Sequence, residues 1–134
     1  MYGFGDVTIM SDAEIDELIY KVIGAAMTVH SEIGYGLREK TYERALVVEL
    51  NHLEIKYSQQ SSYPVIYRDV KVDEYIPDLE VEDALVVDTK VIESIGDYEL
   101  GQMLSYLRIT NKSKGLIINF KQPSLQWRIV TLNP

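Results

Sequence analysis

Two of the aspartates, Asp78 and Asp88, and a lysine, Lys90, stand in a stretch of sequence whose apolar residues are typical of buried strand. The stretch is IPDLEVEDALVVDTKVIE, residues 76–93, and it places Asp88 and Lys90 among valines. Burying an unpaired charge costs free energy, so charges in such a place must be compensated or used. Because successive side chains of a strand point to opposite faces, Asp88 and Lys90 are predicted to share one face.

A tight turn near Glu82 and Asp83 predicts a hairpin in which Asp78 lies directly opposite Asp88. Opposed Cβ atoms in an antiparallel pair are about 5 Å apart, where two carboxylates repel each other when alone. The same separation lets them share one hard cation. Mg²⁺ is the expected ion, with Mn²⁺ as a substitute, because it takes oxygen ligands and keeps several waters. Lys90 would then lie beside a metal-bound water or a substrate phosphate.

The same residues also have a purely structural interpretation. Asp78 and Asp88 could form a solvated sheet edge, or pair with Lys90. Glu43 could be an acid at the rim of an apolar helix stripe, and Gln102 an ordinary surface amide. An Asp-x-Lys pattern in a strand is weak by itself, so it has to be weighed with its surroundings.

Two helices are predicted before the strands. The first, SDAEIDELIYKVIGAAMTVHSEIGYG, begins at Ser11, which forms a capping box with Glu14, and ends at Gly34 and Gly36. Its expected buried stripe consists of Ile15, Leu18, Ile19, Val22, Ile23, Ala26 and Met27.

The second predicted helix, residues 37–53, carries acids in line with its apolar side. Its sequence is LREKTYERALVVELNHL, and helical spacing places Glu43 on the same side as Leu46, Leu50 and Leu53. Glu39 falls on that side too. One or two carboxylates are therefore expected next to the apolar stripe and not on the opposite, wet face.

The spacing of apolar residues then changes to that of strands. Three strands are expected in IKYSQQSSYPVIY, VKVDEYIPDLEV and ALVVDTKVIE, with Pro64 indicating an edge or a bulge and a turn at Arg68 and Asp69. A third helix over residues 97–111 is predicted to have Asp97 as its N-cap. Its apolar side consists of Leu100, Met103, Leu104 and Leu107.

Two more strands, GLIINF and QWRIVTL, complete the expected order α-α-β-β-β-α-β-β. Helices before and after the strands favour an α/β fold in which a sheet is covered on both faces. The length of 134 residues suits one domain spanning residues 1–134, with an irregular N-terminal segment over residues 1–10.

Composition narrows the class of protein further. The chain has no cysteine, no basic region ahead of an apolar stretch and no apolar run of about 20 residues, which makes a cytoplasmic location the simplest expectation. Two histidines are too few for a histidine-rich zinc site. The net charge of −8 argues against a general nucleic-acid coating protein, but not against an enzyme whose acids bind a divalent cation.

Several of these segments together resemble a known family. Pro77-Asp78 followed by Asp88-Thr89-Lys90 resembles the signature of the PD-(D/E)XK nuclease superfamily, which has the restriction-endonuclease-like fold. HSEIGYGLREKTYERALVVEL resembles the segment that defines its GxxExxY family, through Gly36, Glu39 and Tyr42. GQMLSYLRIT and GLIINF resemble the following helix and strand, so the likeness runs over about residues 12–132.

The resemblance implies a central mixed sheet and a role for each matching residue. Asp78 and Asp88 match the two metal-binding acids, with Asp88 shorter by one methylene than the Glu of many relatives. Lys90 matches the lysine that orients or activates the attacking water.

The resemblance also assigns residues on the flanking helices. Glu43 matches a helix glutamate that completes the metal site, a role for which Glu39 is the weaker candidate. Gln102 matches a glutamine near the site, and Tyr106, one turn later, is expected on the same side. His30 also fits the family pattern, where a role in packing or capping is expected.

Two hypotheses for function follow. The first is a nuclease that hydrolyses phosphodiester bonds with Mg²⁺, for which the analogy with the superfamily favours DNA over RNA as the substrate. Scattered cations, Lys112, Lys114, Lys121 and Arg128, could contact phosphates or be ordinary solvated surface. The alternative is a catalytically silent nuclease-fold module for binding or assembly, in which a protein partner or self-association supplies the missing contacts.

Overall fold

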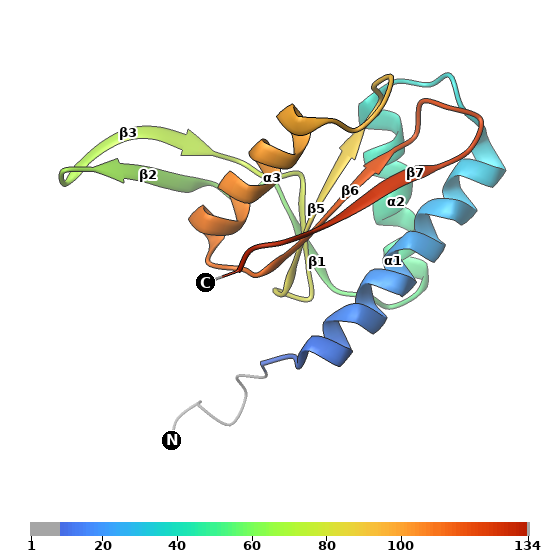
Figure 1. Ribbon diagram of the computed structural model, residues 1–134. Helices are drawn as coiled ribbons and strands as arrows, with labels where there is room; N and C mark the ends of the chain where they lie inside the picture. The colour runs from blue at the N-terminus through green and yellow to red at the C-terminus, as the bar shows by residue number, and fades with distance from the viewer. Residues whose placement is uncertain (1–8, 134) are drawn as a thin grey trace.

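Helices cover both faces of a central sheet in the computed structural model, which describes residues 9–133 (Figure 1). Helices α1 and α2 lie on one face and α3 on the other. This arrangement confirms the expected α/β class. The elements are α1 (Asp12–Ile33), α2 (Glu39–His52), β1 (Tyr57–Gln59), β2 (Tyr63–Tyr67), β3 (Val70–Tyr75), β4 (Leu79–Val81), β5 (Leu85–Lys90), α3 (Asp97–Thr110), β6 (Lys114–Asn119) and β7 (Gln126–Thr131).

Helix α1 begins and ends where its sequence predicts. The backbone N–H of Ser11 donates to Glu14 over 2.9 Å and the N–H of Glu14 donates to the Ser11 hydroxyl over 3.1 Å, which completes the capping box. Gly34 ends the helix with φ 78°, a left-handed value that favours glycine. The irregular segment expected before the helix lies outside the described residues, apart from residues 9 and 10.

The buried stripe of α1 differs from the expected one at Met27, which is 45% exposed. Ala25 and Val29 are buried instead, continuing the spacing of Leu18 and Val22. Met27 lies two positions beyond Ala25, about 200° around the helix, and therefore faces away from the sheet. In the described chain, no helix is both long and apolar enough to cross a membrane.

The main sheet has the strand order β1-β4-β5-β6-β7. Strands β5 and β6 run parallel, with α3 as the crossover between them, and the other neighbours are antiparallel. The β4–β5 hairpin thus lies in the interior of a mixed sheet. Its turn contains Glu82 and Asp83, both with φ 52°, in the expected place.

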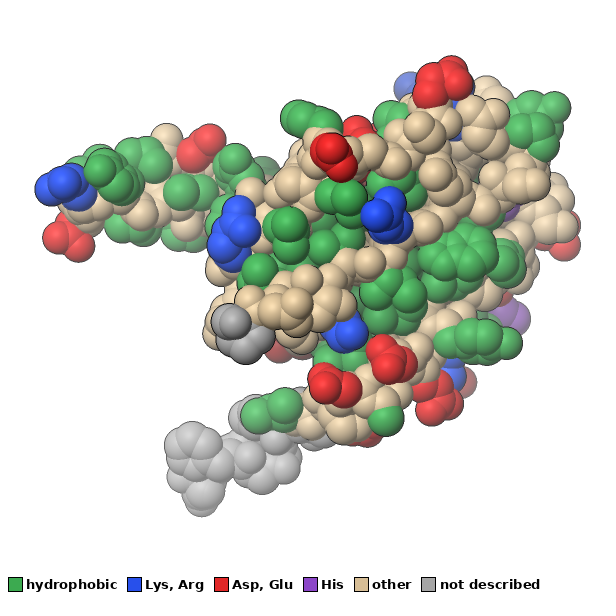
Figure 2. All heavy atoms as spheres, viewed as in Figure 1, with side chains coloured by type: hydrophobic (Ala, Val, Ile, Leu, Met, Phe, Trp, Pro, Cys, Tyr) green, Lys and Arg blue, Asp and Glu red, His purple; other side chains and the backbone are tan. Residues whose placement is uncertain are grey.

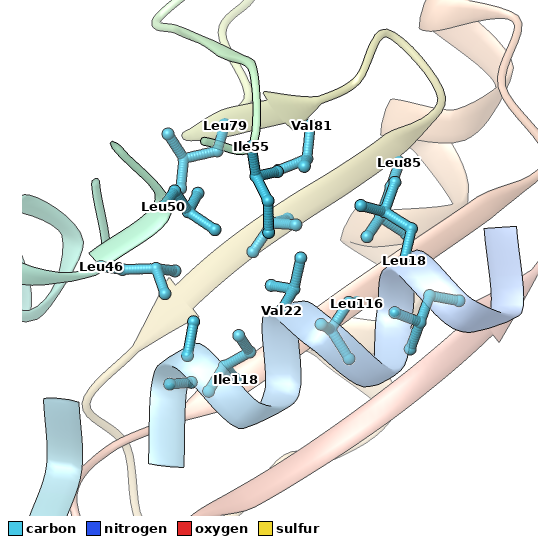
Figure 3. Close-up of a cluster of buried hydrophobic side chains, with 14 of the residues drawn as sticks. Leu18, Val22, Leu46, Leu50, Ile55, Leu79, Val81, Leu85, Leu116 and Ile118 are labelled. Atoms are coloured by element: carbon cyan, nitrogen blue, oxygen red, sulfur yellow. The ribbon is translucent and has the colours of Figure 1, made fainter. Parts of the chain in front are cut away.

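Two apolar clusters lie on the two faces of the sheet. The larger one joins α1 and α2 to the sheet through residues that include Leu18, Leu46, Leu85, Leu116 and Ile118 (Figure 3). The smaller one lies under α3. Its fully buried or nearly buried members are Val86, Ile95, Met103, Leu107, Ile117 and Val130. Met103 and Leu107 are thus buried as expected, while Leu100 and Leu104 pack at the border of this cluster.

Five strands precede α3 where three are expected. Gln60, with φ 57°, turns the chain between β1 and β2, and Pro77, which has no N–H for a ladder bond, follows the end of β3. Strand β1 joins the main sheet, whereas β2 and β3 form a separate hairpin. The register shifts between Val65 and Ile66, next to the proline for which an edge or bulge is expected.

The β2–β3 hairpin extends away from the body of the molecule as an arm (Figure 1). Its turn contains Arg68 and Asp69, both with positive φ, as expected. Apolar side chains are exposed along it, as the space-filling view shows (Figure 2). These side chains are Ile66, Tyr67, Val70 and Val72.

Helix α3 begins one position away from the expected cap. Gly96, and not Asp97, is the N-cap, and its backbone N–H donates to Glu99 Oε1 over 2.7 Å. Glu99 thus supplies its half of a capping box, whereas glycine offers no side-chain acceptor to the first N–H groups of the helix.

Candidate active site

The two aspartates lie at one end of the central hairpin. Leu79 pairs with Val87, and the same register places Asp78, just before β4, opposite Asp88. This confirms the register that the sequence predicts. Asp88 is buried and Asp78 is partly buried. Both carboxylates are therefore held where water offers limited compensation.

The alternation of β5 separates its side chains between the two faces. Leu85 and Val87 belong to the cluster under α1 and α2, whereas Val86 belongs to the cluster under α3. Asp88 and Lys90 continue the series of Val86 and so face α3. The site therefore lies on the α3 side, at the end of β5 where the apolar cluster gives way to charged residues.

Lys90 links the aspartate pair to α3. Its Nζ lies 3.1 Å from Asp88 Oδ2 and donates to Gln102 Oε1 over 2.9 Å. The side chain of Lys90 is 16% exposed, so the ammonium is held with little freedom. The structure thus brings Asp88, Lys90 and Gln102 into one chain of polar contacts.

Thr89 anchors the other aspartate, a contact for which the sequence has no signal. Its backbone N–H donates to Asp78 Oδ2 over 3.1 Å, and its hydroxyl approaches the same oxygen at 3.3 Å. These bonds join the segment before β4 to β5 beyond the last ladder pair. They fix the position of one carboxylate relative to the other.

The electrostatics of the pair are unfavourable for Asp88. Burial, and then the adjacent carboxyl of Asp78, raise the pKa of Asp88 to about 8 in spite of Lys90. Burial by itself lowers the pKa of Lys90, but the carboxylate of Asp88 and two further acids outweigh it and raise that pKa overall. The site therefore holds an ammonium firmly charged beside a carboxyl that ionises with difficulty.

The helix glutamates occupy different surroundings. Glu43 is 2% exposed, pairs with Lys40 over 3.2 Å and accepts from the amide of Gln59 over 3.2 Å. Glu39, one turn earlier, is exposed. Partial desolvation and then the charge of Asp78 raise the pKa of Glu39, which places Glu39 in the electrostatic field of Asp78.

The residues fit a magnesium ion through two ligands. Among residues 9–133, no group of three or more Asp, Glu or His side chains is arranged to hold a metal ion. Mg²⁺, however, is commonly bound by one or two carboxylates together with water and phosphate. Asp78 and Asp88 supply such a pair. The expected third ligand, Glu43, has Lys40 and Gln59 as its polar partners and stays a prediction.

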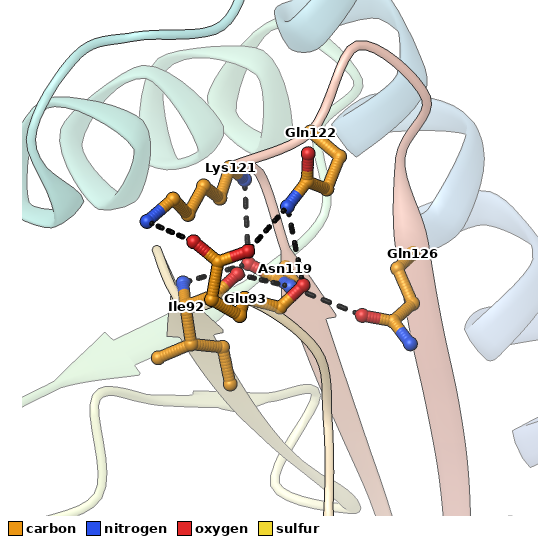
Figure 4. Close-up of polar contacts among 6 residues, drawn as sticks. All are labelled: Ile92, Glu93, Asn119, Lys121, Gln122 and Gln126. Carbon is orange, nitrogen blue, oxygen red and sulfur yellow. Dashed lines mark hydrogen bonds and ion pairs between the residues drawn. The ribbon is translucent and has the colours of Figure 1, made fainter.

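A polar network holds the loop that leads from Lys90 to α3 (Figure 4). Asn119, at the end of β6, accepts from the N–H of Ile92 over 3.0 Å and donates to its carbonyl over 2.9 Å. The Asn119 amide also donates to Gln126 over 3.0 Å, and Lys121 pairs with Glu93 over 2.9 Å. The network fixes the path of the chain between Lys90 and Gln102.

Tyr106 lies beside the site, on the side expected from its spacing to Gln102. Burial, followed by the charges of Asp88 and Asp78, raises the pKa of Tyr106 to about 12. Its ring meets that of Tyr75 edge to face, with centroids 5.9 Å apart. Tyr75 comes from the base of the arm, and nothing in its sequence context signals this contact.

Tyr42 and His30, which the sequence resemblance also singles out, act in packing. Tyr42 is fully buried and stacks on Phe120 with centroids 4.6 Å apart. Its hydroxyl donates to the carbonyl of Gly34 over 2.7 Å and closes the turn between α1 and α2. His30 Nε2 lies 2.9 Å from the carbonyl oxygen of Gln122, in keeping with the expected packing role.

Most of the scattered cations already have acidic partners. Lys112 pairs with Glu80 and Asp83, and Lys114 lies 4.0 Å from Asp16. Lys121 pairs with Glu93, as described above. Arg128 is exposed on β7.

Comparison with known proteins identifies the superfamily of the chain. A family profile described as the PD-(D/E)XK nuclease superfamily matches residues 16–130, most of the chain. The chain belongs to the PD-(D/E)XK nuclease superfamily. Searches of curated proteins and of solved structures gave no match.

Proposed function

We propose that the protein is a nuclease that hydrolyses phosphodiester bonds with Mg²⁺, with DNA preferred over RNA. The observation that carries the proposal is the convergence of Asp78, Asp88 and Lys90 at the end of β5, with Asp88 buried opposite another acid. This arrangement is costly for stability and suits a site that receives a divalent cation and a phosphate. Superfamily membership supports a nucleic acid as the substrate in general.

Each residue has a role that follows from its contacts. Asp78, held by Thr89, and Asp88 would hold the metal, which when bound supplies neutralising charge and a more acidic water. Lys90, oriented by Asp88 and Gln102, stabilises negative charge that develops on the phosphate. Gln102 acts through Lys90 and is a positioning residue. Glu43 is the proposed outer ligand from α2.

We also infer that the chain is of the GxxExxY type within the superfamily. Gly36 has φ 103°, a value that a residue with a side chain adopts only with strain. Tyr42 closes the adjacent turn through Gly34, and Glu39 lies in the field of Asp78. All three named positions of the pattern thus have a physical task in this chain.

The test is cleavage of labelled single-stranded, duplex and branched DNA and of RNA, with Mg²⁺ or Mn²⁺ and with chelator. Lys90→Ala is expected to lose at least about 100-fold in rate, the scale for removing one group that stabilises transition-state charge. Lys21→Ala, an exposed lysine on α1, is the matched control and should cleave as the native chain does. Cleavage that needs metal but is equal in both variants would exclude this site.

The alternative is a nuclease-fold module that binds or assembles without turnover. The observation that favours it is the lack of a three-ligand metal cluster in residues 9–133, together with the net charge of −8. A protein this acidic binds a nucleic acid weakly at physiological salt. Exposed apolar residues on the β2–β3 arm would suit a protein partner or a second copy. No cleavage and no divalent binding at millimolar concentration would favour this function.

A further inference from the structure

A cleft of about 520 Å³ opens between the end of β3 and one face of α3. Three tyrosines line it, Tyr75 from the base of the arm and Tyr98 and Tyr106 from α3. The volume falls in the range of clefts that hold small organic groups, roughly 300–1,000 Å³. Tyr98 is 77% exposed, so its ring is available to a ligand.

The hollow arises from small residues on the face of α3. Tyr98 and Tyr106 are about two turns apart on this side of the helix, and the small residues Gly101 and Ser105 lie between them along the helix axis. A Cβ added at Gly101 would meet no atom within 4 Å. The sequence therefore leaves open a place where an ordinary helical side chain would stand.

The cleft borders the candidate active site through Gln102. Gln102 lines the cleft and accepts the hydrogen bond from Lys90. Tyr106 lines it as well and lies in the field of Asp88. A group bound between the tyrosines is therefore a direct neighbour of a phosphate held at Lys90.

The lining selects for a neutral, flat and polar group. It contains the acids Glu74 and Asp97 and neither lysine nor arginine, so a phosphate would be repelled. Aromatic rings, hydroxyls and the Gln102 amide instead match a nucleobase, which stacks through its π-face and offers donors and acceptors at its edge. Bases within a duplex are already stacked and paired, and only an unpaired base has its face free.

We propose that the tyrosine cleft binds an unpaired nucleobase adjacent to the scissile phosphate, so that the substrate is a single strand or carries unpaired bases. This inference rests on the proposed nuclease function and assigns its substrate class. Stacking on aromatic side chains tolerates any base, so little sequence preference is expected from this subsite.

The test fills the cleft without removing any polar contact. Gly101→Leu places a side chain into the open space, and Gly24→Leu is the matched control, because Gly24 is also an exposed helical glycine with no atom within 4 Å of an added Cβ. Both changes are made in the Lys90→Ala background, so that binding is measured with Mg²⁺ but without turnover. Fluorescence anisotropy then follows a 12-nucleotide single-stranded DNA, the same DNA with an abasic site at each position in turn, and a 12-base-pair duplex.

Gly101→Leu is expected to weaken binding of the intact single strand about 10-fold or more, the effect of losing one stacked base, while Gly24→Leu leaves it unchanged. For one position of the abasic site, the parental protein should bind the abasic strand more weakly than the intact strand by a similar factor. Gly101→Leu should bind that abasic strand as tightly as the parental protein does. Tyr98→Leu should repeat this pattern. Duplex binding should be equal in all variants.

Equal binding of the intact strand by Gly101→Leu and Gly24→Leu would overturn the inference, as would an equal loss for intact and abasic strands. No binding of the single strand by the parental protein would overturn it too. Cleavage of duplex DNA by the native protein would in that case leave the nuclease proposal standing, so the two failures are distinct.

Discussion

Two buried acids on neighbouring strands, Glu80 and Asp88, differ in the charges that surround them. Glu80 of β4 is 3% exposed and Asp88 of β5 is 4% exposed. Glu80 pairs with Lys112 over 3.1 Å and accepts from the Tyr63 hydroxyl over 2.6 Å. Asp88 has Lys90 at 3.1 Å but a second acid, Asp78, on its other side.

The difference separates a structural ion pair from a site with a deficit of positive charge. The partners of Glu80 are a cation and a neutral donor, so its burial is compensated within the fold. Asp88 has a cation and a like charge, and the compensation is incomplete. A divalent cation between Asp78 and Asp88 would remove that imbalance.

The largest contrast is expected in activity. Asp88→Asn should reduce metal-dependent cleavage by at least about 100-fold, because it removes a charge from the metal site. Glu80→Gln, a matched change on the next strand, should retain the rate of the native chain per folded molecule. Rates are measured at equal concentrations of folded protein, judged by circular dichroism, and equal losses in both variants would contradict the distinction.

The next contrast is expected in stability. Lys112→Met leaves Glu80 buried without its cation and should lower the free energy of unfolding by about 3 kcal/mol. Lys121→Met removes an exposed pair with Glu93 and should change it by less than about 0.5 kcal/mol. Urea denaturation monitored by fluorescence measures both changes in the free energy of unfolding. A loss below about 1 kcal/mol for Lys112→Met, on the order of that for an exposed pair, would argue against a structural role for the ion pair of Lys112 and Glu80.

Asp88→Asn should have the opposite effect on stability in metal-free protein. The pKa of Asp88 is about 8 in the folded chain against an ordinary value of 3.8, so the folded state binds more protons between these pH values. Stability from this group therefore falls as pH rises from about 4 to 8. At pH 9 the free energy of unfolding of Asp88→Asn should exceed that of the native chain by about 2 kcal/mol, the scale of relieving an uncompensated buried charge. At pH 4 the two free energies should be about equal.

Denaturation in chelator at several pH values tests this dependence. The stability advantage of Asp88→Asn over the native chain should grow as the pH rises and Asp88 ionises in the native chain. A gain that is the same at pH 4 and pH 9 would trace to packing and not to charge.

The smallest contrast concerns the hydroxyl that supports Glu80. Burial, and then the hydrogen bond to Glu80, raise the pKa of Tyr63 to about 12, so the hydroxyl remains a donor throughout the neutral range. Tyr63→Phe should cost about 1 kcal/mol. Tyr20→Phe, which changes an 80% exposed ring on α1, serves as the control in thermal unfolding and should have no effect. Equal effects would mean that the bond to Glu80 contributes nothing measurable.

The sequence predicts the parts of the fold that depend on short-range spacing. The register of Asp78 and Asp88 follows from a short turn and the alternation of side chains, and the α1 capping box follows from Ser11 and Glu14. Helices on both sides of the sheet follow from the element order. These features need no knowledge of distant contacts.

What the sequence could not predict depends on tertiary context. Glutamine is not a residue type that indicates a left-handed backbone. The sequence therefore does not predict that the chain turns at Gln60 and separates the arm from the main sheet. The partners of Glu43 and the contact of Tyr75 with Tyr106 join segments far apart in the chain. The sequence does not indicate the cleft for the same reason, since its walls come from β3 and α3.

Calorimetric titration of Mg²⁺ into the native chain, Asp88→Asn and Glu80→Gln at pH 8 tests whether Asp78 and Asp88 bind a divalent cation. The native chain and Glu80→Gln are expected to bind Mg²⁺ with equal affinity, and binding is expected to disappear in Asp88→Asn. Binding that survives Asp88→Asn unchanged, or no binding by the native chain at millimolar Mg²⁺, would contradict binding of the cation by Asp78 and Asp88.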